Sequence, residues 1–258
     1  MSTVSPVPYI WYKFDTLSTT KVTNSGSAGA TLDATLNNGA SVTTTDDNPV
    51  GSRCLNLTNN TVNFSKDYNG QYVSIPPFTL STTYSFSCWF KKNVKENDSY
   101  LNIFDFGDHS GTTEPHADPL ALLLVGLNGV IVIEKRPRTY TSSTTRQGYC
   151  DNKWHHLVVI NDGTNFVFYI DNVISNTAKI TKRMDSESFR MVNNYLGRNF
   201  DNGGYSTIQL DDFRVYTTPL TANDIATLFT YKKVLPSNID YQTIVIAIVA
   251  FIIFMIII

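Results

Sequence analysis

The side chains best suited to bind a metal ion lie in one polar segment, between Phe104 and Leu120. Five of them carry ligand oxygen or nitrogen atoms: Asp108, His109, Glu114, His116 and Asp118. A second polar segment, 199–204, adds the carboxylate of Asp201. These segments predict a metal site that uses Asp108, Asp118 and Asp201. A solvated polar loop is the favoured alternative, and zinc bound through the two histidines is a further one, since zinc accepts imidazole nitrogen.

Two adjacent histidines, His155 and His156, are the other candidates for chemistry. They lie at the start of an apolar run, and the chain contains no Gly-x-Ser-x-Gly turn of the kind that presents a nucleophilic serine. Neighbouring side chains of a strand point to opposite faces. The pattern therefore predicts one packed and one exposed histidine rather than a catalytic pair.

The elements around these histidines have the pattern of a β-hairpin. Two apolar runs, 154–161 and 165–172, flank a polar turn at Asp162-Gly163. We expect Trp154 and Phe168 to lie on the inward side of these strands, together with Leu210 and Phe213 of a later strand over 207–216. Cys88, which alternates with Phe86 and Phe90, is also predicted to be buried.

The strand at 207–216 carries an irregularity and is followed by a helix signal. Its apolar alternation shifts by one residue at Asp211-Asp212, which predicts a β-bulge. Thr221 and Asp224 have the spacing of a capping box. The spacing predicts a helix over 222–231, with its buried face formed by Ile225, Leu228 and Phe229.

Several of these motifs together resemble a known family. The hairpin, the strand Ile208-Gln209-Leu210-Asp211-Asp212-Phe213-Arg214-Val215-Tyr216 and three upstream segments, 12–15, 72–76 and 84–91, are similar to the laminin-G-like, concanavalin A-type domains. The resemblance also includes the turn Asn24-Ser25-Gly26 and covers nearly the whole chain up to Tyr231. It implies an all-β fold, a two-sheet antiparallel jelly-roll sandwich, and a structural role for the Asp211-Asp212 pair.

The resemblance also has implications for chemistry. Laminin-G-like domains often hold calcium at the rim of the sandwich, which makes calcium the expected ion for Asp108, Asp118 and Asp201. Glucanases of this fold carry a Glu-x-Asp-x-x-Glu strand, because their two carboxyl groups must face one sugar. The four glutamates of this chain are isolated from one another: Glu96, Glu114, Glu134 and Glu187. We therefore expect no enzymatic activity.

Length and composition are those of one all-β domain. The chain has 258 residues, few glutamates and many Thr, Ser, Asn, Tyr and Phe, which favour strands and turns over helices. Its net charge of −2 and pI near 6.1 provide no basic surface for nucleic acid. A nucleic-acid partner is therefore not expected.

The end of the chain has the composition of a membrane span. The 18 residues from Tyr241 to Ile258 contain no charge, and as a helix they would rise about 27 Å at 1.5 Å per residue. We expect one C-terminal transmembrane helix over 239–258. Residues 1–14 lack a signal-peptide pattern, and Lys232 and Lys233 precede the span. The sequence therefore predicts a tail anchor with the domain facing the cytosol.

This topology divides the chain into four parts and affects two other expectations. We expect a flexible start at 1–8, the jelly roll at 9–231, a linker at 232–238 and the anchor at 239–258. A cytosolic domain keeps cysteines reduced. The odd number of cysteines, Cys54, Cys88 and Cys150, then needs no disulfide, and the four sequons are expected to carry no glycan: Asn56, Asn59, Asn63 and Asn97.

The functional expectation is a membrane-anchored, non-enzymatic module that recognises a glycan or protein through its jelly-roll loops. One alternative is a structural membrane protein of a large virus particle, located in the virion or in a host membrane. A second is an atypical glycan-active enzyme, against which the missing carboxylate pair argues.

Overall fold

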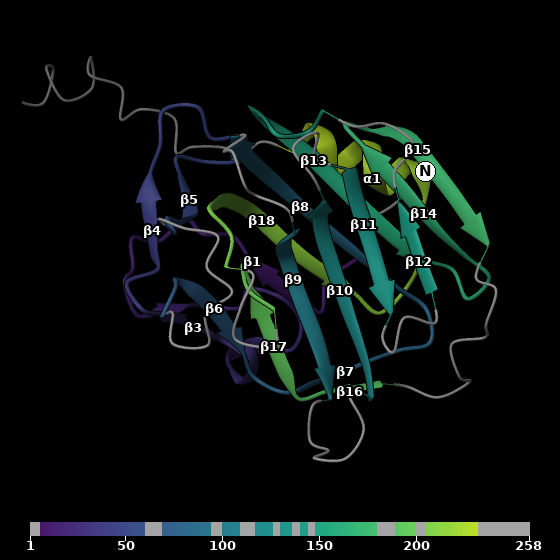
Figure 1. Ribbon diagram of the computed structural model, residues 1–258, viewed down its shortest axis with the longest axis horizontal. Helices are drawn as coiled ribbons and strands as arrows, with labels where there is room; N and C mark the ends of the chain where they lie inside the picture. Colours follow the sequence, from purple (N-terminus) through teal and green to yellow (C-terminus); the bar gives the residue numbers. More distant parts are fainter. Residues whose placement is uncertain are drawn as a thin grey trace, which may run out of the picture.

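The protein is an antiparallel β-sandwich. The structure, a computed structural model, describes residues 6–59, 69–93, 100–108, 117–125, 130–135, 140–143, 148–179, 189–199 and 205–231. In Figure 1, strands β9 (Tyr100–Asp108), β10 (Ala117–Val125) and β17 (Asn193–Leu196) of one sheet lie in front of strands of the other sheet: β8 (Tyr84–Asn93), β13 (Asp151–Asn161) and β18 (Ile208–Tyr216). Every strand pairing between described residues is antiparallel, which confirms the all-β sandwich predicted from the sequence.

The first sheet, sheet A, contains eight strands. Seven follow the spatial order β15 (Val173–Lys179), β14 (Asn165–Ile170), β13 (Asp151–Asn161), β8 (Tyr84–Asn93), β18 (Ile208–Tyr216), β5 (Arg53–Leu57) and β4 (Ser41–Thr44). The eighth, β1 (Ile10–Tyr12), pairs with β18. Strands β13 and β14 are the expected hairpin, and its turn lies at Asp162-Gly163 as predicted.

The second sheet, sheet B, also contains eight strands. Their spatial order is β12 (Tyr140–Ser143), β11 (Val130–Lys135), β10 (Ala117–Val125), β9 (Tyr100–Asp108), β17 (Asn193–Leu196), β6 (Tyr72–Ile75), β3 (Ala34–Asn37) and β2 (Lys21–Val22). A separate two-stranded sheet pairs β16 (Phe189–Met191) with β7 (Phe78–Leu80), and a short 3-10 helix, η1, spans Gly29–Leu32.

The main core lies between the two sheets. Strand β14 alternates fully buried residues with half-buried ones, as a strand with one face in a core must. Phe86 of sheet A and Phe104 of sheet B meet across the interface with ring centroids 4.6 Å apart. Burying a side chain of this size contributes about 1.5 to 3 kcal/mol to folding. The predicted burial of Phe168, Leu210, Phe213 and Cys88 is confirmed.

The prediction for Trp154 is wrong. Register pairs Trp154 with Lys91 and His156 with Trp89, so Trp154 shares the outer face of sheet A with these residues and is partly exposed. The reason is the alternation of β13: Leu157 and Val159 occupy the core, so every second residue counted from His156 points away from it.

One helix covers part of the outer face of sheet A. Helix α1 (Ala222–Thr230) has the predicted capping box, with Thr221 as N-cap and Asp224 as its partner. Ile225 and Leu228 are buried, as expected, in a second core with sheet residues such as Val158. Phe229 is only half-buried and stacks on Trp89 with ring centroids 5.6 Å apart.

The predicted linker at 232–238 and anchor at 239–258 lie outside the described residues. Within the described ranges, no helix has the length and hydropathy needed to cross a bilayer. The transmembrane helix therefore stays a prediction from the sequence.

Candidate functional site

The expected metal ligands are placed only in part. Asp108 ends β9, Asp118 lies near the start of β10, and Asp108 pairs with Ala117 in the register of these strands. The polar segment expected between Phe104 and Leu120 is thus strand at both ends. His109, Glu114, His116 and Asp201 lie outside the described residues. The described part of the chain holds no group of three or more potential metal ligands, and the calcium site stays a prediction.

The Asp211-Asp212 pair forms the predicted bulge. The pairing of β18 with β8 shifts register between Asp211 and Arg214, and Asp212 has a φ of 51°. The carboxylate of Asp211 is fully buried, accepts a hydrogen bond from the Asp212 amide at 2.8 Å and faces the Asn48 amide at 3.0 Å. Burial, together with the negative charge of Asp212, raises the pKa of Asp211 to about 9. Asp211 therefore holds its proton more tightly than an ordinary carboxyl group.

Asp212 forms a buried ion pair instead. Its carboxylate lies 2.7 Å from Nη2 of Arg214 and accepts a hydrogen bond from the indole of Trp11 at 2.6 Å. The Arg214 guanidinium lies 4.3 Å from the Trp11 ring and 4.8 Å from the Tyr231 ring. This cluster joins β1, β18 and the residue that follows α1. The arrangement supports the structural role expected for the acidic pair.

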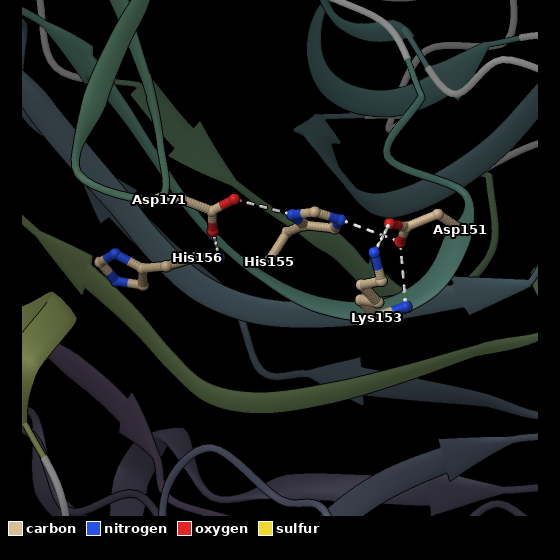
Figure 2. A network of polar contacts seen from close by, with 5 residues as sticks. All are labelled: Asp151, Lys153, His155, His156 and Asp171. Atoms are coloured by element: carbon tan, nitrogen blue, oxygen red, sulfur yellow. Dashed lines mark hydrogen bonds and ion pairs between the residues drawn. The ribbon is translucent and has the colours of Figure 1, made fainter.

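The two histidines lie on opposite sides of β13, in different environments (Figure 2). His155 has both ring nitrogens against carboxylates: Nδ1 is 2.8 Å from Asp171 and Nε2 is 3.0 Å from Asp151. Burial disfavours the charged imidazolium, but the hydrogen bonds to Asp171 and Asp151 outweigh it and raise the pKa of His155. Asp171 also accepts a hydrogen bond from the His156 amide at 2.9 Å, so it fixes the end of the hairpin.

His156 is buried beneath α1 rather than exposed. Its ring lies 5.0 Å from the Trp89 ring and 5.9 Å from the Phe229 ring, and Nε2 is 3.0 Å from the hydroxyl of Ser87. Burial, reinforced by the positive charge of Arg214, lowers the pKa of His156 to about 3. The expectation of one exposed histidine is wrong, because α1 covers the outer face of sheet A where His156 lies.

A different set of side chains gathers on the outer face of sheet B. In β6, Val73 and Ile75 enter the core, which turns Tyr72 and Ser74 outward; in β17, Leu196 enters the core and Tyr195 points outward. Thr35, Ser74 and Tyr195 are consecutive register partners across β3, β6 and β17. We call the group around them the Arg198 platform; it consists of Thr35, Asn37, Tyr72, Ser74, Tyr195, Arg198 and Tyr205.

Arg198 holds the aromatic part of this platform together. Its guanidinium carbon lies 4.2 Å from the Tyr195 ring centroid, 4.5 Å from that of Tyr72 and 5.7 Å from that of Tyr205. The rings of Tyr72 and Tyr195 meet edge to face at 5.7 Å. Arg198 and Tyr205 are buried, whereas Tyr72 and Tyr195 keep part of their surface in solvent. The cation thus fixes two partly exposed rings.

The turn that positions Arg198 requires glycine. Gly197 has a φ of 80°, and a Cβ atom there would collide with the side chain of Leu57. The Gly197 amide donates to the carbonyl of Ile103 at 3.1 Å, and its own carbonyl accepts from the amide of Ser206 at 2.8 Å. These bonds join the end of β17 to β9 and to the segment that carries Tyr205. The platform is therefore built on a rigid turn.

Chemically, the platform combines aromatic rings with neutral hydrogen-bonding groups. Asn37 donates to the Ser74 hydroxyl at 3.0 Å, and Thr35 is exposed beside them. Burial raises the pKa of Tyr195 above its usual value, so its phenol stays protonated and can donate as well as accept. No pattern in the sequence indicated this group. The alternation of the two strands could have predicted that Tyr72 and Tyr195 point outward, but no sequence pattern predicts their contact with Arg198.

Comparison with known proteins places the fold. Residues 67–226, more than half of the chain, match the family model described as the concanavalin A-like lectin/glucanases superfamily. No curated protein sequence matches the chain.

Solved structures with the same fold include a domain of an extracellular enzyme and two binding domains. Domain 4 of a GH43 extracellular arabinanase from Geobacillus stearothermophilus, in complex with arabinotriose, has a TM-score of 0.62 at 16% identity, with 88% of this chain and 100% of that chain covered. The botulinum neurotoxin serotype G binding domain has a TM-score of 0.59 at 14% identity, with 86% of this chain and 50% of that chain covered. The binding domain of Paraclostridial Mosquitocidal Protein 1 has a TM-score of 0.57 at 12% identity, with 86% of this chain and 52% of that chain covered. The chain thus spans about half of these two toxin binding domains.

Proposed function

Because the chain belongs to the concanavalin A-like lectin/glucanases superfamily, we propose that it is a non-enzymatic binding module that recognises a carbohydrate on the Arg198 platform. The observation that carries the proposal is the pair of partly exposed tyrosine rings, Tyr72 and Tyr195, held by a buried cation on the outer face of sheet B.

The composition of the platform suits a sugar. Aromatic faces pack against the apolar C–H faces of a sugar ring, and a few placed polar groups fix its orientation. Here Tyr72 and Tyr195 provide the rings, and Thr35, Asn37 and Ser74 provide hydroxyl and amide groups beside them. Strands spaced about 4.8 Å apart put about 10 Å between Thr35 and Tyr195, which is enough for a short oligosaccharide lying across the sheet.

The acidic residues near the platform support binding without hydrolysis. Asp105 is the register partner of Tyr195 on β9, and it is fully buried. A carboxylate covered in this way cannot reach a glycosidic oxygen, and glycoside hydrolysis needs two carboxyl groups that face the sugar. The isolated glutamates of the sequence provide no substitute pair.

The comparisons include a carbohydrate complex, which supports a carbohydrate as the first ligand to test. The match covers the whole of the arabinanase domain, and that domain was solved with arabinotriose bound. The toxin binding domains are consistent with a recognition module on the same fold. Arabinotriose is therefore the first probe, followed by an array of plant, microbial and animal glycans.

Calorimetry and glycan-array binding with the detergent-solubilised full-length protein test the proposal. We expect Tyr195→Ala to weaken glycan binding at least tenfold, because one stacking face is lost, and Tyr195→Phe to weaken it less. Tyr169→Ala is the matched control, since Tyr169 is a partly buried tyrosine on sheet A. Equal binding by the Tyr195→Ala and Tyr169→Ala proteins would exclude the platform, and no binding to any glycan would exclude the carbohydrate function.

We further propose that the apolar segment 239–258 anchors the module in a membrane. The support comes from the sequence, in which the last 18 residues carry no charge. Together, the two proposals describe a carbohydrate-binding module that segment 239–258 holds at a membrane surface.

A further inference from the structure

Three side chains on the outer face of sheet A gather where the chain leaves helix α1. We call Trp11, Lys13 and Tyr231 the exit group. Trp11 alternates with the core residues Ile10 and Tyr12, so it points away from the core. Its ring lies 6.2 Å from the ring of Tyr231, the residue that follows α1. The exit group therefore marks the point on the sandwich from which the C-terminal tail continues.

The aromatic part of the exit group is held in place and is still partly exposed. The indole N–H of Trp11 donates to the carboxylate of Asp212 at 2.6 Å, and the Trp11 backbone amide donates to Asn24 at 2.7 Å. Trp11 and Tyr231 are both half-buried. Trp and Tyr combine an apolar ring with a hydrogen-bonding group, and for this reason they concentrate at membrane–water interfaces.

The exit group also carries a positive charge. The ammonium of Lys13 lies 4.1 Å from the centroid of the Trp11 ring. Arg214 lies 4.3 Å from the same ring, but Asp212 at 2.7 Å balances its charge. No described carboxylate lies within ion-pair distance of Lys13. The charge of Lys13 is therefore left for an anionic partner.

The sequence adds positive charge directly after the exit group. Lys232 and Lys233 follow Tyr231. The chain contains no acidic residue between Asp224 and Asp240. Anionic lipids give a bilayer surface a negative potential that attracts lysines next to a membrane span. The charge around the exit group thus complements the surface of an anionic bilayer.

The short linker brings the exit group to the bilayer in an anchored protein. As a flexible chain, the seven residues 232–238 have a root-mean-square length of about 15 Å. A tether of this length gives a weak contact a high effective concentration, so the face that carries Tyr231 can meet the surface at little further cost in entropy. Val7, which is 71% exposed and lies four residues before Trp11, adds an apolar side chain at the start of the same strand.

Building on the membrane anchor proposed above, we infer that the exit group lies against the headgroup region of an anionic phospholipid bilayer. Trp11 and Tyr231 lie at the level of the headgroups, and Lys13 pairs with the lipid phosphate and carboxylate groups. This contact turns the outer face of sheet A toward the bilayer and the Arg198 platform toward the opposite side. The partner that the domain itself recognises on the membrane is thus the anionic lipid surface.

Fluorescence quenching with the full-length protein in vesicles tests this contact. The three native cysteines are buried, so an introduced surface cysteine can be labelled selectively with bimane. Val7→Cys reports on the exit group, and Thr35→Cys, at an exposed position of the Arg198 platform, is the matched control. The vesicles contain phosphatidylserine and phosphatidylcholine with a nitroxide quencher in its headgroup. We expect the label at position 7 to be quenched at least threefold more than the label at position 35.

The charge of Lys13 is tested in the same vesicles. Lys13→Gln should reduce quenching of the label at position 7 at least twofold when phosphatidylserine is present, and should have a smaller effect in vesicles of phosphatidylcholine alone. Lys153→Gln alters a lysine with 76% of its side chain exposed and is the control. It should leave the quenching unchanged in both kinds of vesicle.

Flotation of the vesicles separates a failure of the anchor from a failure of the exit group. A full-length protein that does not float with the vesicles would overturn the anchor and, with it, the lipid contact. A protein that floats but shows equal quenching at positions 7 and 35 would overturn the lipid contact alone. So would a Lys13→Gln protein that melts like the wild type and keeps its full quenching in phosphatidylserine vesicles.

Discussion

The pKa values of several residues depend on their surroundings in the fold rather than on residue type. His155 and His156 are neighbours in the chain, yet one has its pKa raised by two carboxylates and the other has its pKa lowered to about 3 by burial under α1. The pKa of Asp211 is raised by burial and by the charge of its neighbour Asp212, which is paired with Arg214. Local environment, rather than residue type, decides which of these groups is ionised at neutral pH.

At this scale we predict a pH dependence that comes from His155. Its pKa in the folded protein is raised above the value of about 6.5 in the unfolded chain. The folded state then binds more protons than the unfolded state, so the stabilisation is complete below about pH 6.5 and is lost as the pH rises through the folded pKa. Asp171→Asn should lower the pKa of His155, measured by NMR titration of the imidazole proton, and reduce the fall in stability above pH 6.5.

The control for this prediction is Asp162→Asn, which alters a carboxylate in the hairpin turn that bonds Asn165 and not His155. The asparagine at position 171 still offers an oxygen to the amide of His156, so the hairpin is retained. An unchanged His155 pKa in the Asp171→Asn protein would show that the carboxylate does not control the proton.

Among the elements, α1 is the one whose presence changes the surface of the sandwich. It covers the outer face of sheet A with Ile225 and Leu228 and stacks Phe229 on Trp89. None of the described elements covers sheet B over Tyr72 and Tyr195, which are partly exposed. Among the described residues the two outer faces therefore differ in cover: that of sheet A is packed under α1, and that of sheet B leaves two tyrosine rings partly exposed.

The stability of α1 depends on its cap. The Thr221 hydroxyl accepts from the Asp224 amide at 3.2 Å, and the Asp224 carboxylate accepts from the Thr221 amide at 2.9 Å. Thr221→Ala should lower the free energy of unfolding by about 1 kcal/mol, since the Asp224 amide loses its acceptor and the Asp224 carboxylate loses the Thr221 hydroxyl as a donor. Thr227→Ala, at an exposed position inside the helix, should change it little. Urea melts of both proteins provide the measurement, and equal losses would argue against the cap.

Across the whole molecule, the end of α1 and the platform lie on opposite faces of the sandwich. Tyr231 follows α1, with its ring 6.2 Å from the ring of Trp11 on β1 of sheet A. The platform lies on the outer face of sheet B. The seven residues 232–238 span at most about 25 Å when extended. In an anchored protein, we expect the platform to face away from the membrane.

The anchor itself leads to a fractionation prediction. Deleting residues 244–258 should move the protein from the membrane pellet to the soluble fraction, because 15 apolar residues outweigh any peripheral contact. Removal of residues 1–5 is the control and should leave the protein in the pellet. A full-length protein that is extracted from membranes by high salt or carbonate would contradict the anchor.

The sequence alone determined the features that depend on near neighbours in the chain. The hairpin at Asp162-Gly163, the bulge at Asp211-Asp212 and the capping box of Thr221 were all predicted correctly, because turn chemistry, alternation and cap spacing act over a few residues. Only the tertiary structure decided which side of β13 enters the core, and hence that Trp154 points outward. It also decided that α1 covers this outer face, which buries His156. The tertiary structure also decided the contact between Arg198 and Tyr72, two residues that are far apart in sequence and that the pairing of β17 with β6 brings together. Such contacts depend on strand order and register across the whole sandwich, and no local pattern of residues specifies these.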